Sequence, residues 1–303
     1  MNEPFVSFIT VNYNGLGDTI EMITSLKKIV KSVSYEIIVV DNASRKDEIS
    51  PLKELFSDII CIKSEKNLGF AAGNNLGIDI AKGKYLFFIN NDTYILDDNI
   101  KFLIDRLDSD NKIGGVSPKL LFHEPFNTIQ FAGFTPFTKI TLRNEIIGYC
   151  EPDDEKYNTP QITPYLHGAA MVIKKEVIEK VGKMPELFFL YYEEMDWCEM
   201  IKRAGYELWY EPKCVVYHKE SRSTGKENSL KVYYHTRNRL LFAKRNLKHS
   251  YQVCSILYQL IIANSIHILK YLIRCRCDLA YAAMKGAIAF LDNKELIIKN
   301  QIK

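Results

Sequence analysis

The chain has 303 residues, of which 47% are hydrophobic and 25% are charged, with a formal net charge of +3. This composition is that of a globular protein with a sizeable core, and it excludes a mainly disordered chain. The segment Met1–Thr10 has no basic region before its apolar run, so we expect no secretory signal and a cytoplasmic protein. The seven cysteines predict reduced thiols, because only Cys275 and Cys277 lie close together and a zinc site would need a second pair.

Four apolar runs in the first 95 residues are separated by polar turns and helical patterns. The runs are residues 6–11, 36–40, 59–63 and 85–89. Their spacing is typical of βαβ units in a mainly parallel sheet. After the first run, Asp18 and Glu21 predict a capping box for a helix whose apolar face includes Ile20, Ile23 and Leu26. We therefore predict an α/β domain.

From about residue 114 to 163 the pattern weakens and prolines recur, which predicts loops and short strands of an acceptor-binding or lid region. A strand is expected within 167–173, followed by a helix that Gly182 ends. A second helix, with Trp197 and Ile201 on its apolar side, is expected to end at Gly205. Short strands are predicted at 208–210 and 215–217.

The C-terminal part of the chain is basic. Residues 219–303 contain 16 Lys and Arg against 5 Asp and Glu, a net of +11, which leaves −8 for residues 1–218. This asymmetry predicts a polyanionic partner, either membrane phospholipid or nucleic acid. The longest apolar stretch, 251–273, is interrupted by polar residues such as Gln259, Asn264 and Lys270. The interruptions favour an interfacial helix over a membrane-spanning one, with a soluble helical hairpin as the alternative.

Asp92 follows the apolar run 85–89, at the kind of strand end where open α/β sheets bind ligands. A single carboxylate there suits Mg²⁺ or Mn²⁺ completed by a diphosphate, although Asp92 alone is explained equally well as a turn cap. His218 also follows a predicted strand and could add a nitrogen ligand. A lone histidine is more often a packed or surface residue.

Other polar segments lie at strand ends or before helices. Asp41 ends the second apolar run, where its carboxylate could bind a base or ribose or simply cap a turn. The segment 10–15 ends the first run in a similar way, and the glycines of 66–75 would let backbone N–H groups approach a ligand. Neither a G-x-G-x-x-G nor a P-loop motif is present, which argues against a Rossmann dehydrogenase and a P-loop NTPase.

Glu193, Glu194 and Asp196 cluster at the start of a predicted helix. Adjacent acids resist simultaneous ionisation while a helix N-terminus favours the anion, so one of them could be poised as a general base. Solvated carboxylates at a helix start are the alternative interpretation.

Seven segments, taken in order, resemble the motifs of the inverting glycosyltransferases of family 2, which have the GT-A fold. They are residues 9–14, 39–44, 67–74, 90–93, 168–171, 192–196 and 216–218. Residues 233–238 also look like a segment of the rhamnosyltransferase-like branch. The resemblance covers about residues 5–225 and implies a Rossmann-like mixed sheet flanked by helices.

The resemblance also implies roles for individual residues. Glu194 would deprotonate the acceptor hydroxyl, and Asp92 with His218 would hold Mn²⁺ or Mg²⁺ on the diphosphate. The nucleoside diphosphate would be bound by Thr10, Asn12, Asn14, Asp41, Asn67, Gly69, Phe70, Asn74, Asn90 and Asn91.

Two positions depart from the family pattern. Asn90 replaces the first acid of the usual Asp-x-Asp, which leaves Asp92 as the only carboxylate of that motif. Glu194 replaces the usual Asp, so Glu193 and Asp196 are alternative bases.

These observations predict a catalytic domain over 1–225 and a basic helical extension over 226–303 that binds a membrane or forms a homodimer. The expected function is transfer of a sugar from dTDP-rhamnose or a UDP-hexose to a glycan acceptor, lipid-linked, in surface polysaccharide synthesis at the cytoplasmic membrane face. The alternatives are a sugar nucleotidyltransferase and a non-enzymatic nucleic-acid or scaffold protein that uses the basic tail.

Overall fold

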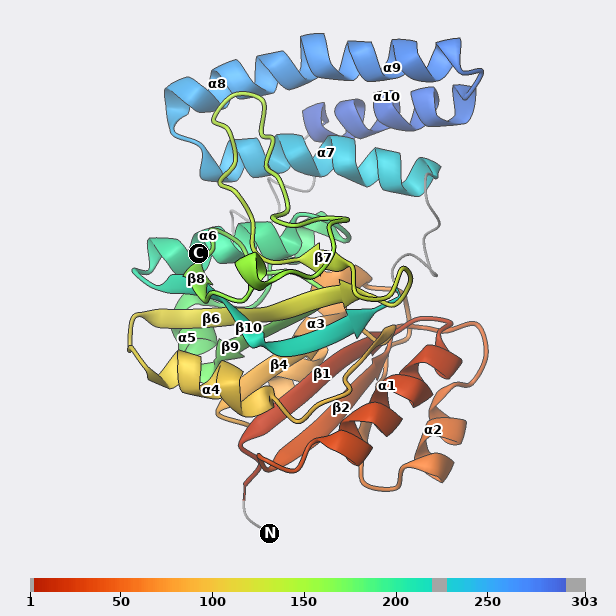
Figure 1. Ribbon diagram of the computed structural model, residues 1–303. Helices are drawn as coiled ribbons and strands as arrows, with labels where there is room; N and C mark the ends of the chain where they lie inside the picture. Colours follow the sequence, from red (N-terminus) through yellow and green to blue (C-terminus); the bar gives the residue numbers. More distant parts are fainter. Residues whose placement is uncertain (1–2, 220–227, 293–303) are drawn as a thin grey trace.

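The computed structural model describes residues 3–219 and 228–292, and over these residues the centre of the molecule is a ten-stranded mixed sheet (Figure 1). The main path of the sheet runs β3-β2-β1-β4-β9-β6-β10-β5, with β7 paired to β6 and β8 paired to β10. The strands are β1 (Val6–Asn12), β2 (Tyr35–Asp41), β3 (Ile60–Lys63), β4 (Tyr85–Ile89), β5 (Thr93–Tyr94), β6 (Ile113–Phe122), β7 (Ile129–Phe131), β8 (Gln161–Ile162), β9 (Ala170–Lys174) and β10 (Glu207–His218).

The half of the sheet formed by β3, β2, β1 and β4 is parallel, as the spacing of apolar runs predicts. The register pairs Asn12 with Asp41, so the polar ends of β1 and β2 lie side by side. Antiparallel β9 joins this half to the parallel pair β6 and β10. The predicted α/β class and mixed sheet flanked by helices are therefore confirmed.

Helices pack on both faces of the sheet. In the view of Figure 1, α1 and α4 lie in front of it and α3, α5 and α6 lie behind. Their bounds are α1 (Leu16–Ile29), α2 (Ile49–Leu55), α3 (Gly69–Ile80), α4 (Ile100–Asp108), α5 (Lys175–Val181) and α6 (Glu193–Arg203), with short 3₁₀ turns η1 (Glu155–Tyr157) and η2 (Glu186–Phe188). The predicted helix end at Gly182 is confirmed by its φ of 98°, a conformation that favours glycine.

The predicted capping box in α1 is wrong. The helix begins at Leu16, with Gly15 before it and no side-chain cap, so Asp18 lies inside the first turn. Asp18 and Glu21 instead bind Lys219, whose Nζ lies 2.8 Å from Asp18 Oδ1 and 2.5 Å from Glu21 Oε2. These two carboxylates therefore hold the end of β10 against α1.

The region 114–163 is more regular than its sequence predicts, because β6 is ten residues long and buried throughout. The polar residue that hides this strand is Lys119, which is 2% exposed and pairs with Asp153 at 2.7 Å. Pro118 lies where the pairing with β10 is irregular, between Glu211 and Val215. The two short strands predicted at 208–210 and 215–217 are accordingly parts of one strand, β10.

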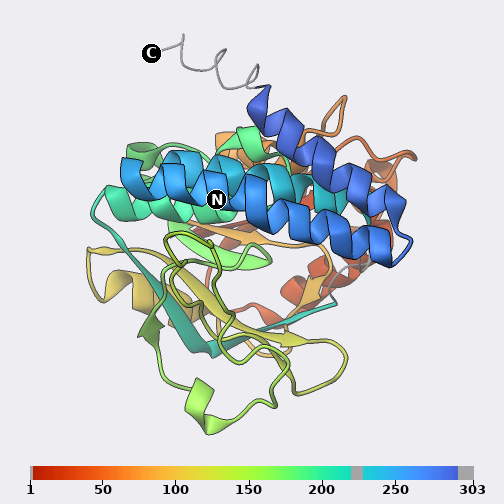
Figure 2. The same cartoon turned by 90° about the horizontal axis from the view of Figure 1, so that it is seen from above.

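A layer of helices lies over one edge of the sheet domain (Figure 1) and extends across the molecule when viewed from above (Figure 2). It contains α7 (Ser229–Asn246), α8 (His249–Leu257), the π-helical turn η3 (Tyr258–Ala263), α9 (Asn264–Ile273) and α10 (Cys277–Leu291). We call α7 to α10 the helix layer. The predicted boundary between residues 225 and 226 falls outside the described residues.

The first helix of the layer is built into the sheet domain. Leu240, Leu241 and Phe242 of α7 belong to the main hydrophobic core. Asn238 is fully buried, and its Nδ2 lies 2.7–3.0 Å from the carbonyl oxygens of Phe188, Leu190 and Tyr191. Because α7 satisfies backbone groups of the segment before α6, it is structurally part of the domain that holds the sheet.

The outer helix of the layer is attached more loosely. Residues His249–Ile273 form one helix of 25 residues that is long and apolar enough, by length and composition alone, to cross a membrane. A loop that rises from the sheet domain in Figure 1 reaches it. Ser255 Oγ donates to Ile140 O and Gln259 Nε2 donates to Thr141 O, both at 2.8 Å.

Candidate active site

The carboxyl ends of β1, β4 and β10 open onto a cavity of about 470 Å³, which we call the strand-end pocket. Most of the sequence-predicted binding residues meet there, although they come from distant parts of the chain. Those that line the pocket are Asn14, Asn67, Gly69, Phe70, Asn90, Asn91, Asp92 and His218.

The two predicted metal ligands are neighbours in this pocket. The pairing of β5 with β10 places His218 opposite Thr93, and His218 Nε2 lies 3.1 Å from Asp92 Oδ1. On the other side of the ring, Nδ1 lies 2.8 Å from Oε1 of Gln130, which is buried. Because Oε1 can only accept, Nδ1 carries the proton in this contact and Nε2 faces Asp92 and the pocket. An ion bound between the two side chains would take the place of the proton on Nε2.

The Asp92 carboxylate is held in its ionised form. Burial is the largest influence and opposes ionisation, but the hydrogen bond and charge of His218 outweigh it, so the pKa of Asp92 is below its ordinary value. An anion beside an imidazole nitrogen is a donor set that suits Mn²⁺ or Mg²⁺.

The distance between the two side chains also fits a shared ion. Neighbouring ligands around an octahedral ion with bonds of about 2.1 Å lie about 3 Å apart. Within residues 3–219 and 228–292, no group of three or more His, Cys, Asp or Glu side chains is arranged to hold a metal. A diphosphate and water would therefore have to supply the remaining ligands.

Four predicted binding residues lie beneath the pocket and not in its lining. Thr10, Asn12, Asp41 and Asn74 are each at most 2% exposed. Asn12 Nδ2 donates to Asp41 Oδ1 at 3.1 Å and to Glu48 Oε2 at 2.7 Å. Since buried amides and carboxylates need such partners, Asn12, Asp41 and Glu48 form a hydrogen-bonded floor at the ends of β1 and β2. Thr10 Oγ1 has no partner among the described residues, and Asn74 Nδ2 donates to Phe70 O within α3.

A tight turn positions the start of α3 at the pocket. Asn67 Oδ1 accepts hydrogen bonds from Gly69 N at 2.9 Å and from Asn42 Nδ2 at 3.1 Å. Gly69 has φ of +81°, and a Cβ there would lie 2.1 Å from Phe189 O, so a side chain cannot be accommodated. The helix begins at Gly69 itself, within the glycine-containing segment and not after it. Its first N–H groups have partners inside the protein, because Gly69 N donates to Asn67 Oδ1 and Phe70 N donates to Phe189 O at 2.8 Å.

The acidic cluster lies in the first turn of α6, as predicted, but its members are in different environments. Asp196 is fully buried, and Arg245 binds both of its oxygens at 2.9–3.1 Å. Asn246 Nδ2 donates to it at 2.6 Å. The structure therefore does not bring Asp196 to the pocket as a base, because its oxygens are engaged with α7.

Neither Glu193 nor Glu194 is among the residues that line the strand-end pocket. Glu193 is 3% exposed, and burial together with the charge of Glu194 raises its pKa well above the ordinary value. Burial raises the pKa of the half-buried Glu194 to about 7. A Cβ at Gly168 would lie 3.6 Å from Glu194 Cγ, so this side chain is next to the turn that carries His167 into the pocket.

The backbone that leads into α6 is strained. Phe189, Tyr191 and Tyr192 have φ of 67°, 68° and 76°, a left-handed conformation that is costly for bulky residues. The segment is held in place by hydrogen bonds from Asn238 Nδ2 to its backbone carbonyl oxygens. Strain of this kind is common where a chain presents side chains to a ligand, and Tyr191 lines the pocket.

Several residues that line the strand-end pocket were not predicted from the sequence. Gln130 lies on β7, in the region of weak pattern, and no signal distinguishes it. His167 directly precedes the predicted motif 168–171 and is a lone histidine in the sequence; burial and the nearby His218 lower its pKa to about 3. Its Nδ1 accepts from Ala169 N at 3.1 Å, which leaves Nε2–H as a donor. Lys231 comes from α7, which sequence analysis assigns to the extension.

The family model for glycosyl transferase family 2 matches residues 7–182, which is more than half of the chain. The chain belongs to this family. It is therefore a glycosyltransferase, and the family predicted from the ordered motifs is confirmed. Of the alternatives considered from the sequence, neither a sugar nucleotidyltransferase nor a nucleic-acid scaffold has support from this match.

Relatives and solved structures agree with the family. The chain is 27% identical over 301 residues to a low-salt glycan biosynthesis hexosyltransferase, Agl10, of Haloferax volcanii, covering 95% of this chain and 92% of that protein. It is 24% identical over 257 residues to the dTDP-rhamnosyl transferase RfbF of Shigella flexneri, covering 78% and 79%.

The fold is that of GT-A glycosyltransferases. A mannosyltransferase of Pyrobaculum calidifontis, solved with GDP-Man and Mn²⁺, matches with a TM-score of 0.59 at 15% identity, over 97% of this chain and 89% of that one. GalNAc-T7, solved with UDP, GalNAc and Mn²⁺, matches with a TM-score of 0.61 at 15% identity, over 88% of this chain and 57% of that one. The predicted GT-A fold is confirmed.

Proposed function

We propose that this glycosyltransferase is metal-dependent and inverting. It moves a sugar from dTDP-rhamnose or a UDP-hexose to a hydroxyl of a lipid-linked glycan, in surface polysaccharide synthesis at the cytoplasmic face of the membrane. The observation that carries the proposal is the meeting of Asp92 Oδ1 and His218 Nε2, 3.1 Å apart, in the strand-end pocket at the ends of β1, β4 and β10. The proposed base Glu194 lies beside the Gly168 turn next to this pocket, and the pKa values of the two carboxylates are shifted in opposite directions. Asp92 is kept ionised by His218, whereas burial raises the pKa of Glu194 to about 7. Such a pair suits one carboxylate as an ion ligand and the other as a proton acceptor.

The donor diphosphate would lie between the start of α3 and the Asp92–His218 pair. Gly69 and Phe70 at the start of α3 line the same pocket as Asn91, which is fixed by a hydrogen bond from its Nδ2 to Thr19 Oγ1 at 3.0 Å. Asp92 and His218 would hold Mn²⁺ or Mg²⁺, which when bound neutralises charge on the departing diphosphate. The relatives solved with Mn²⁺ and a nucleotide or nucleotide sugar support this assignment.

Glu194 would act as the base. Its carboxylate takes the proton of the acceptor hydroxyl while that oxygen forms a bond to the anomeric carbon of the donor. The bond from this carbon to the diphosphate oxygen breaks, and the nucleoside diphosphate leaves with the electron pair. Attack on the face opposite the leaving group inverts the configuration. Burial and the charge of Glu194 raise the pKa of Glu193 well above its ordinary value, which favours its neutral form beside the base.

The membrane part of the proposal rests on the helix layer. Residues 228–277 contain nine Lys and Arg and no Asp or Glu, and the outer helix exposes most of its apolar side chains. Basic residues beside an exposed apolar helix are typical of attachment to an anionic membrane surface. A lipid-linked acceptor would be presented at that surface.

A donor-binding screen tests the proposal. Calorimetric titration with UDP-, dTDP- and GDP-sugars, with and without Mn²⁺, is expected to show metal-dependent binding of one nucleotide class. Asp92→Ala should weaken this binding by roughly 10–100-fold or more. Asp97→Ala, which changes an exposed neighbouring carboxylate, is the matched control and should bind normally. Absence of donor binding by the unaltered protein, or equal binding by Asp92→Ala, would contradict the proposal.

A further inference from the structure

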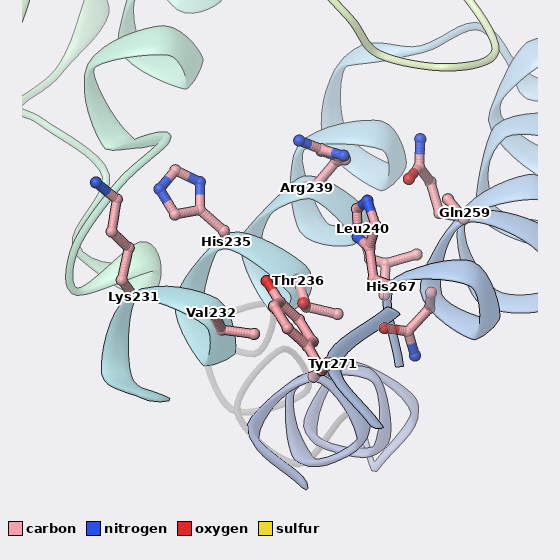
Figure 3. Close-up of a pocket in the computed structure, with 12 residues that line it drawn as sticks. Lys231, Val232, His235, Thr236, Arg239, Leu240, Gln259, His267 and Tyr271 are labelled. Atoms are coloured by element: carbon pink, nitrogen blue, oxygen red, sulfur yellow. The ribbon is translucent and has the colours of Figure 1, made fainter. Parts of the chain in front are cut away.

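A second cavity of about 470 Å³ lies within the helix layer (Figure 3), and we call it the helix-layer pocket. It is formed by α7 on one side and by η3, α9 and α10 on the other. Its lining includes Lys231, His235 and Arg239 of α7, Gln259 of η3, His267 and Tyr271 of α9, and Ala283 of α10.

The charged side chains that line this pocket are cationic, with no Asp or Glu among the lining residues. Arg239 is half-buried, and its Nε donates to the Tyr192 hydroxyl at 2.9 Å. No ion pair of Arg239 with a carboxylate is found in the described parts of the chain. His235 lies one turn away on the same helix, and burial with the nearby Arg239 and Lys231 lowers its pKa to about 4. A neutral imidazole and an unneutralised guanidinium suit a phosphate ligand.

The helix-layer pocket adjoins the strand-end pocket. Lys231 lines both cavities. Tyr191 lines the strand-end pocket and stacks on His235 of the helix-layer pocket, with ring centroids 4.3 Å apart. A ligand with a phosphate in one pocket could therefore extend a sugar past Lys231 into the other.

The outer helix places the helix-layer pocket next to an apolar surface. Ile261 is 64% exposed, Leu269 58% and Ile273 74%. They belong to the helix of 25 residues that also contributes Gln259 and His267 to the pocket wall. A helix of this kind lies in the interface of a bilayer with its apolar side chains among the lipid tails, where the neighbouring cationic pocket would be at the depth of the lipid phosphates.

We propose that the helix-layer pocket binds the phosphate of a membrane lipid, and specifically the polyprenyl phosphate or diphosphate that carries the acceptor glycan. The inference rests on the proposed function and names the part of the acceptor that this protein recognises. Charge complementarity argues for a lipid over a second copy of this basic chain, and the contact through Lys231 argues for the acceptor lipid over bulk phospholipid.

Vesicle binding by the full chain tests this site. Phosphatidylcholine vesicles would carry a few per cent of either polyprenyl phosphate or phosphatidylglycerol, matched in total charge, and binding would be measured by co-sedimentation. Arg239→Gln removes the guanidinium, and Ala263→Phe adds bulk at the pocket lining. Arg274→Gln removes a positive charge from the same layer outside the pocket and is the matched control.

The unaltered protein is expected to prefer polyprenyl phosphate vesicles by about tenfold or more. Arg239→Gln and Ala263→Phe should lose this preference while still binding phosphatidylglycerol vesicles, and Arg274→Gln should weaken both kinds of binding equally. Equal binding of both vesicles by the unaltered protein, or an Arg239→Gln profile that matches that of Arg274→Gln, would overturn the site. If Arg239→Gln fails to fold by circular dichroism, Ala263→Phe decides the outcome.

Donor binding separates this inference from the proposed function. Titration with the nucleotide sugar does not need the lipid, so Arg239→Gln should bind the donor normally. If the unaltered protein binds no nucleotide sugar, the proposed function fails; if donor binding is normal and the vesicle preference is absent, only the lipid site fails.

Discussion

The strand-end pocket and the helix-layer pocket have the same volume of about 470 Å³, but they are built differently. The first lies on a floor of buried amides and carboxylates that bind one another, such as Asn12 with Asp41 and Glu48. The second has two cationic side chains in its lining, Lys231 and Arg239. Its outer wall is a helix held to the sheet domain by two side-chain hydrogen bonds and by the partly buried Ile256 and Leu260. A site that positions reacting atoms needs fixed geometry, whereas a site that captures a charged lipid needs charge and access.

Glu194→Gln should have the largest effect, because it removes the proposed base that acts beside the strand-end pocket. We expect kcat to fall by ~10²–10⁴-fold with donor affinity nearly unchanged. Glu193→Gln is the matched control and should cost far less, since burial and the charge of Glu194 raise the pKa of Glu193 well above its ordinary value and make it the poorer proton acceptor. Steady-state transfer assays and donor titrations measure both quantities. Transfer at the normal rate by Glu194→Gln would remove this residue from the base role.

The pH dependence sharpens the same test. Because the folded-state pKa of Glu194 is raised to about 7, the folded state binds this proton more tightly than the unfolded state. The resulting stabilisation is present at low pH and is lost as pH rises through about 7, the range in which the base becomes active. Activity should therefore rise as thermal stability falls between about pH 5 and 8. Glu194→Gln should make both activity and thermal stability less dependent on pH in this range. If both pH dependences are unchanged in this variant, the raised pKa of Glu194 is contradicted.

Asp196→Asn should lower the free energy of unfolding more than it lowers catalytic activity. It tests how firmly α7 is attached to the sheet domain through α6. The Asp196–Arg245 pair joins α6 to α7; Asp196 is fully buried but Arg245 is exposed, so losing the charge of Asp196 should cost about 1–2 kcal/mol. Urea unfolding should show a lower free energy with donor binding retained in the folded fraction. Asp278→Asn, in an exposed pair with Arg276, is the control and should leave the transition unchanged. An unchanged unfolding transition for Asp196→Asn would show that α7 is not anchored through this pair.

Parts of the molecule were predictable because their signal is local. The strands β1 to β4 follow from apolar runs separated by helical patterns, and Asp92 and His218 could be placed at strand ends on that basis. The strand β6 was not predictable, because the buried Lys119 obtains its partners Asp153 and Asn158 from more than 30 residues away. Pairing across such distances leaves no periodic pattern in the sequence.

The same limit applies to the candidate site. Asp196 could not be separated from Glu193 and Glu194 by sequence, since the difference is the contact with Arg245, 49 residues later. Gln130 and His167 acquire their positions only when β7 and β9 pair with β6, which in turn pairs with β10. The sequence motifs therefore predicted residues proposed to bind the ion or accept a proton. Residues that orient those side chains, such as Gln130, could be identified only from the structure.

Gln130→Leu tests such an orienting residue. The change removes the oxygen that lies 2.8 Å from His218 Nδ1, so the ring loses the partner that fixes its orientation. Partners of this kind are typically worth 10–100-fold in metal affinity, so we expect Mn²⁺-dependent donor binding to weaken by about that factor. Gln130→Glu keeps an acceptor at this position and should restore most of the affinity. Full Mn²⁺ dependence in Gln130→Leu would show that the ring is oriented by the packing around it.

Ser255→Ala should have the smallest effect and tests whether the outer helix is loosely attached. Removing the hydroxyl that donates to Ile140 O should cost about 1 kcal/mol, because one neutral hydrogen bond is lost. The loss should appear as faster amide hydrogen exchange in α8 and η3, with exchange in α7 unchanged, since α7 belongs to the main core. Thr24→Ala, which removes a hydroxyl bound within α1 alone, is the matched control and should leave exchange in α8 and η3 unaltered. If Ser255→Ala lowers the stability of the whole chain cooperatively, the outer helix is as firmly built in as α7, and the contrast between the two pockets is one of charge only.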